Sequence, residues 1–124
     1  MSKFIKSRLR SFSYAFQGWY YVLRNEQNAW VHAVITVLVI FLAFWLDLPT
    51  RDWAVILLAI VMVWAAEFFN TAIESIVDLV SPDKHPLAKV GKDVGAAAVL
   101  IAALTSVLIG LLILGPPLWK RLDF

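Results

Sequence analysis

A row of polar side chains continues a long apolar run near the middle of the chain. Glu67, Asn70, Glu74 and Asp78 are spaced three, four and four residues apart, so a helix carries all four on one face. The apolar run before them, residues 53–66, is 14 residues long. At the helical rise it covers about 21 Å, which is less than the roughly 30 Å of a bilayer core. Glu67 is therefore expected just inside the membrane boundary, with the other two acids beyond it.

The chemistry that this row could perform depends on two further polar segments. Glu26 lies in a short polar stretch before the first apolar run, and Lys92 and Asp93 stand just before the last one. Carboxylates that share a hard cation, beside a lysine, suit a magnesium-nucleotide. A further carboxylate at the bilayer boundary could accept a proton from a lipid hydroxyl. No Walker-type phosphate loop is present. The alternative is that these charges are solvated helix ends, which explains Glu67 and Asn70 poorly.

The apolar stretches that must position these residues predict a membrane protein. The chain of 124 residues is 61% hydrophobic, against about 45–50% in soluble domains. It contains no cysteine, which excludes disulfides and thiolate sites. Two widely separated histidines make a histidine zinc site improbable, and the basic residues form no nucleic-acid stripe. We expect a single membrane-embedded domain, 1–124, with transmembrane helices at residues 29–46, 53–80 and 95–114.

Residues 1–28 are predicted to form a surface helix followed by a polar hinge. Leu9, Phe12, Phe16 and Trp19 recur at three- and four-residue spacing opposite a face that includes Arg10 and other polar side chains. This pattern is typical of an amphipathic helix in the membrane interface. The alternative is a soluble helix packed on a partner domain. The fold class is therefore all-α, with one surface helix and three spans.

The distribution of basic residues predicts the orientation. Eight of the 11 lysines and arginines lie in the N-terminal segment and the 81–93 segment, which we expect to be a polar loop. The positive-inside rule then places both segments in the cytoplasm. Gly115, Pro116 and Pro117 are expected to end the third span. No cleavable signal peptide is recognised.

Three blocks of residues resemble one known family. The row from Glu67 to Asp78 is similar to the signature of the small bacterial integral-membrane diacylglycerol kinase and undecaprenol kinase family. Lys92-Asp93 followed by Gly95 resembles a second block, and Asn25-Glu26 a third. The resemblance extends over essentially the whole chain. It implies a homotrimeric, ATP-dependent lipid kinase of the cytoplasmic (inner) membrane, which phosphorylates diacylglycerol or undecaprenol and takes part in lipid metabolism.

The resemblance also implies roles for individual residues. Glu67 is similar to the general base that deprotonates the lipid hydroxyl, and Asn70 to a polar support beside it. Glu26 and Glu74 are similar to the carboxylates that hold the Mg²⁺ of the nucleotide. The remaining positions that resemble the nucleotide site are Tyr14, Asp83, Lys84, His85, Lys92 and Asp93. Each active site is implied to be shared between neighbouring subunits of the trimer.

Several interpretations stay open on the sequence alone. His32, six residues after Glu26, is interpreted as an interfacial histidine hydrogen-bonded to a neighbouring helix, with no assigned role. A small multi-pass transporter subunit would place an ionisable residue near the bilayer midplane. The first and third spans have no such residue at their centres. A non-catalytic scaffold would have no use for an intact acid row with Lys92. The sequence does not decide which lipid is the substrate.

Overall fold

The computed structural model describes all 124 residues and contains only helices. The four helices are α1 (Lys3–Asn25), α2 (Gln27–Trp45), α3 (Thr50–Val80) and α4 (Pro86–Arg121). The last three are long and apolar enough to cross a membrane. The predicted all-α class, with one amphipathic helix before three candidate spans, is confirmed.

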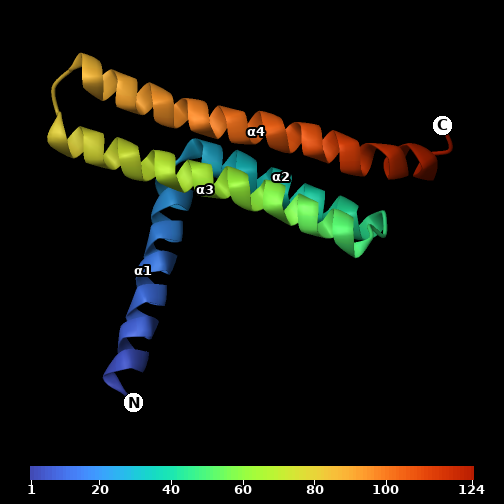
Figure 1. Ribbon diagram of the computed structural model, residues 1–124, viewed down its shortest axis with the longest axis horizontal. Helices are drawn as coiled ribbons and strands as arrows, with labels where there is room; N and C mark the ends of the chain where they lie inside the picture. Colours follow the sequence, from blue (N-terminus) through green and yellow to red (C-terminus); the bar gives the residue numbers. More distant parts are fainter.

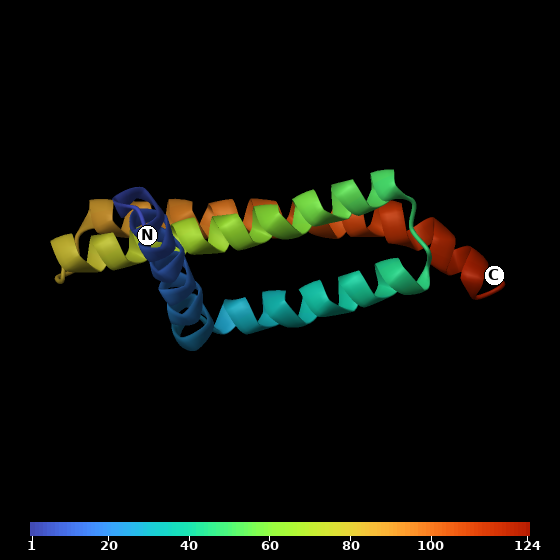
Figure 2. The same cartoon turned by 90° about the horizontal axis from the view of Figure 1, so that it is seen from below.

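α3 and α4 form the closely packed pair of the structure. They run antiparallel and side by side along most of their length, whereas α2 contacts them at few places (Figures 1 and 2). Small residues allow the close approach, because Ala59 of α3 and Gly95 and Ala102 of α4 are all buried. The Ser106 hydroxyl of α4 also donates a hydrogen bond to the Ala59 carbonyl oxygen, at 3.0 Å. The acid row lies on α3, so the packing of this helix pair determines its position.

α1 leaves the other helices at a steep angle (Figure 1). The Ser2 side chain caps its first turn by accepting from the Ile5 N–H at 3.3 Å. Near its other end, Trp19 packs on α3, with ring centroids 5.0 Å from Trp64 and 4.5 Å from Phe68. The amphipathic helix is therefore held near its C-terminal end, and its first 18 residues lie exposed, as a helix in the membrane interface would.

The main hydrophobic cluster lies far from the acid row, where α2 turns into α3. It contains Ala43, Leu46, Leu48, Ile56 and Leu114. Leu46 and Leu48 flank Asp47, whose φ of 52° reverses the chain. Only 13 of the 124 residues are buried, so most apolar side chains are exposed on the surface of the single chain.

Two predicted boundaries of the last helix are wrong. The segment 81–93 was expected to be a loop, but α4 begins at Pro86, because proline suits the first helical turn and the His85 side chain accepts from the Leu87 N–H. The helix also continues through Pro116 and Pro117 to Arg121. Gly115 has no Cβ to clash with the ring of Pro116, which removes part of the usual barrier to an internal proline.

Candidate active site

A cavity of about 380 Å³ opens where the start of α2 faces the middle of α3. It is lined by Glu26, Asn28, Val31, His32, Glu67, Asn70, Glu74, Ala96, Val99, Leu100 and Ala103. Four sequence-predicted site residues, Glu26, Glu67, Asn70 and Glu74, are thus brought together. Glu67 is only 1% exposed, and apolar side chains of α2 and α4 form part of the wall. The cavity combines a buried acid with an apolar lining, as a site for a lipid hydroxyl requires.

Asn70 links the acid row to α4. Its side-chain amide donates a hydrogen bond to Glu74 Oε1 at 3.3 Å. Its own oxygen, Oδ1, is buried without a hydrogen-bond partner and faces Gly95 of α4. A Cβ added at Gly95 would overlap this oxygen. The position of Asn70 therefore depends on glycine at residue 95.

Glu26 occupies the junction between α1 and α2. Its backbone is extended, with φ −104° and ψ 115°, and its N–H donates to the Val22 carbonyl oxygen. Burial raises the pKa of the Glu26 carboxyl above 4.5, and the nearby charges of Glu74 and Glu67 raise it further. Three carboxylates thus repel one another at one end of the cavity.

We expect Glu26→Gln to stabilise the folded protein at neutral pH. Because its pKa is raised on folding from 4.5, the folded protein binds this proton more tightly than the unfolded chain does. The stability that Glu26 contributes therefore falls as the pH rises through the raised pKa. Thermal unfolding in detergent micelles should show a higher melting temperature for the variant at about pH 8 and no gain at about pH 4. A variant that melts lower at neutral pH would contradict this prediction.

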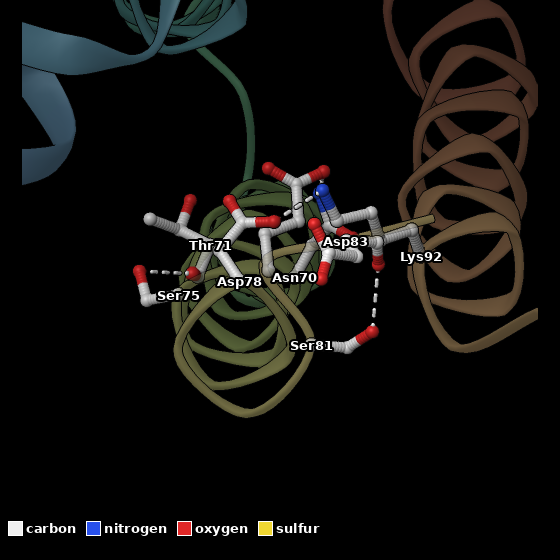
Figure 3. Close-up of polar contacts among 8 residues, drawn as sticks. Asn70, Thr71, Ser75, Asp78, Ser81, Asp83 and Lys92 are labelled. Atoms are coloured by element: carbon white, nitrogen blue, oxygen red, sulfur yellow. Dashed lines mark hydrogen bonds and ion pairs between the residues drawn. The ribbon is translucent and has the colours of Figure 1, made fainter. Parts of the chain in front are cut away.

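A second cavity, of about 610 Å³, lies between the ends of α3 and α4. It is lined by five further site residues that were predicted from the sequence: Asp83, Lys84, His85, Lys92 and Asp93. Figure 3 shows Lys92 reaching from α4 to Asp78 on α3, with 2.5 Å between Nζ and Oδ1. Ser81 stabilises the connecting loop by donating to the Asp83 carbonyl oxygen at 2.8 Å. Lys89 pairs with Asp93 one turn along α4.

One predicted site residue lies apart from the others. Tyr14 is 64% exposed on α1 and lines neither of the two cavities. It borders a shallow basic groove with Lys3, Lys6, Ser7, Arg10 and Ser11. Within one chain, the structure does not bring Tyr14 to the acid row.

Two contacts were not predicted from the sequence. Asp78 was recognised as part of the acid row but not as the partner of Lys92. His32 was interpreted as hydrogen-bonded to an unspecified neighbouring helix. It instead lies 3.6 Å from Glu67 on α3 and makes no hydrogen bond through Nε2. Its place six residues after Glu26 puts it almost two turns into α2. The six-residue spacing from Glu26 is the only feature of the sequence that could have indicated that His32 lies near the acid row.

The carboxylates of Glu26 and Glu74 fit a hard divalent cation whose remaining ligands come from outside the protein. Glu26 and Glu74 line one cavity, and carboxylate oxygens are the protein ligands that Mg²⁺ prefers. Burial and, after it, the charge of Glu74 raise the pKa of the Glu26 carboxyl, and a bound cation would offset the repulsion between the two carboxylates. The chain supplies no group of three acidic or histidine side chains that could hold a metal by themselves. Phosphate oxygens and water would complete the coordination shell, as is usual for Mg²⁺.

Comparison with known proteins shows which family the chain belongs to. Residues 13–114 match the model of the prokaryotic diacylglycerol kinase family. The chain belongs to this family. Family membership, together with the three apolar helices, makes the protein a membrane-embedded lipid kinase that transfers a phosphoryl group from ATP. The matched region contains the whole acid row and both cavities.

Individual relatives carry two different substrate names. The chain is 40% identical over 109 residues to the undecaprenol kinase of Bacillus subtilis, covering 88% of this chain and 89% of the relative. It is 42% identical over 111 residues to the diacylglycerol kinase of Synechocystis, covering 89% of this chain but only 63% of that longer protein. It is 30% identical over 100 residues to the diacylglycerol kinase of Escherichia coli, covering 81% and 82% of the two chains. None of these matches supports a transporter.

Proposed function

We propose that the protein transfers the γ-phosphoryl group of ATP to the hydroxyl of a membrane lipid alcohol, diacylglycerol or undecaprenol. The observation that carries this proposal is the buried Glu67 carboxylate, which lies in a cavity with one apolar wall and one acidic wall. The product is phosphatidate or undecaprenyl phosphate. Both lipids present a primary hydroxyl at headgroup level, where the acid row is expected to cross the membrane boundary.

Glu67 acts as the general base in this proposal. It takes the proton of the lipid hydroxyl while the hydroxyl oxygen attacks the γ-phosphorus in line. The new oxygen–phosphorus bond forms as the bond to the leaving ADP oxygen breaks. Asn70 supports this geometry by holding Glu74 through its amide. Much of the acceleration would come from positioning and from fixed charges around the transferred group.

The second cavity is proposed to take the nucleotide. Lys92 would neutralise phosphate charge, and Asp83, Lys84, His85 and Asp93 line the same space. Glu26 and Glu74 would hold Mg²⁺, which supplies positive charge to the phosphates when it is bound. The two cavities follow each other along α3, because Asn70 and Glu74 line one while Val77 and Asp78 line the next.

A homotrimer and a cytoplasmic active site belong to the same proposal. α2 is loosely packed on α3 and α4, and large apolar surfaces are exposed, which favours association with further copies. Tyr14 would then act in the site of a neighbouring subunit. Both basic segments lie toward one end of the bundle, since α1 joins α2 toward the end at which α3 and α4 are connected (Figure 1). The positive-inside rule places this end in the cytoplasm of a bacterial inner membrane.

The test is phosphoryl transfer by the purified full-length protein in mixed micelles. Diacylglycerol and undecaprenol are offered in parallel, with labelled ATP and Mg²⁺. We expect label in one lipid or both, loss of transfer with EDTA, and recovery with added Mg²⁺. Label in neither lipid, with protein shown to be helical, would contradict the proposed substrate class.

Asp78→Asn tests whether the second cavity binds ATP. Removing the carboxylate releases Lys92 from its ion pair, so the ammonium is no longer held where the phosphates are proposed to bind. We expect the KM for ATP to rise about two- to fivefold with little change in kcat, because exposed ion pairs contribute at most about 1 kcal/mol. Arg51→Gln, which breaks an ion pair at the opposite end of α3, is the matched control. An unchanged KM in Asp78→Asn would argue against this placement.

A further inference from the structure

His32 of α2 faces Glu67 of α3 inside the first cavity. The distance from His32 Nε2 to Glu67 Oε2 is 3.6 Å. The two side chains are only 15% and 2% exposed, although His32 stands less than two turns from the start of its helix. The contact joins the helix that follows the Glu26 junction to the helix that carries the acid row.

Both atoms of this contact are buried, and neither has a hydrogen-bond partner. Buried polar atoms are nearly always paired, because leaving one unpaired costs as much as a lost hydrogen bond. At 3.6 Å the two atoms lie beyond the roughly 2.7–3.2 Å range of N–H···O hydrogen bonds, so they do not form one in this structure. A small rotation of either side chain would bring them within that range. Each atom is therefore the natural partner of the other.

The surroundings hold the imidazole ring in this position. The Trp64 ring stands nearly edge-on to it, with centroids 6.2 Å apart. Trp64 is itself fixed, because its indole N–H donates to the Thr36 hydroxyl at 3.1 Å. Thr36 lies one turn beyond His32 on α2, so the same two helices hold both the ring and its neighbour.

We propose that His32 is a positioning residue for Glu67. The ring donates its Nε2 hydrogen to Glu67 Oε2, which fixes the carboxylate and leaves Oε1 to take the proton of the lipid hydroxyl. His32 keeps its own proton throughout. This role rests on the proposed function of Glu67 as the base, and it adds a residue from α2 to the machinery on α3.

The kinetic test compares two variants of His32 in the mixed-micelle assay. His32→Leu removes the donor, and we expect kcat to fall about 10- to 100-fold with the KM for ATP within about twofold, the loss of one hydrogen bond to a charged group. His32→Gln keeps an N–H donor near the Nε2 position and should recover most of the lost kcat. Gly110→Ala, which adds a Cβ on α4 where no atom lies within 4 Å, should retain full activity.

Two kinetic outcomes would overturn the proposal. A His32→Leu variant with kcat within about twofold of the parent would show that Glu67 needs no partner on α2. A His32→Gln variant as inactive as His32→Leu would show that the imidazole itself is required, for example as a proton acceptor.

A second measurement reads the contact without turnover. The chain has two histidines, so ring ¹⁵N NMR in micelles gives two sets of signals, and those missing from His32→Gln belong to His32. We expect Glu67→Gln to shift the His32 signals and Gly110→Ala, whose added Cβ meets no atom within 4 Å, to leave them in place. Signals unmoved by Glu67→Gln would overturn the proposal. Shifted signals in a protein that phosphorylates no lipid would confirm the contact while contradicting the proposed function.

Discussion

Glu67→Gln is expected to abolish lipid phosphorylation while the protein stays folded. Glutamine keeps the shape of the buried side chain but cannot take the proton of the attacking hydroxyl. A positioned general base contributes about 10²- to 10⁴-fold in rate, so kcat should fall by at least that lower factor. The Glu67 side chain is only 2% exposed. Replacing its buried charge by a neutral amide should not lower the stability of the protein.

The measurement is the initial rate of labelled phosphate transfer, with the melting temperature recorded for the same preparation. Asp52→Asn is the matched control, since it changes an acid to an amide in the first turn of the same helix. It should retain the parent's rate. Residual activity of Glu67→Gln above about a hundredth of the parent's would contradict the assignment of Glu67 as the base.

Gly95→Ala is expected to reduce activity strongly with little loss of stability. The added Cβ would overlap Oδ1 of Asn70, and the Asn70 side chain must turn away. That movement breaks the hydrogen bond from Asn70 to Glu74 and shifts a carboxylate proposed to hold Mg²⁺. Because the overlapped atom ends a flexible side chain, the backbone need not move. A misplaced catalytic group can cost about 10²-fold, so we expect kcat to fall about 10- to 100-fold.

Gly110→Ala provides the control on the same helix. A Cβ at Gly110 meets no atom within 4 Å, and alanine favours a helix over glycine by about 1 kcal/mol. This variant should keep its activity and melt at the same temperature or slightly higher. If Gly95→Ala and Gly110→Ala had equal activity, the close approach of Gly95 to Asn70 would have no role in catalysis.

Large parts of the fold were predictable because they depend on local sequence. Apolar length alone predicted three spans, and the 3.6-residue periodicity predicted the amphipathic helix before them. The predicted end of α4 was wrong, because Pro116 and Pro117 do not end the helix. Whether a proline ends a helix depends partly on whether the residue before it clashes with the proline ring. Helix ends are decided by such local geometry more than by composition.

The candidate site was likewise predictable only in part. The sequence by itself determined the row of Glu67, Asn70 and Glu74, because residues on one helix have a fixed spacing and share a face. It could not determine which residues of other helices meet that row. Only the packing of α2 and α4 against α3 brought His32 to Glu67, Gly95 to Asn70 and Lys92 to Asp78. Lys92 and Asp78 are 14 positions apart in the sequence, and the other two pairs are 25 or more positions apart. Helix packing decides which of such distant residues meet, and no local pattern encodes it.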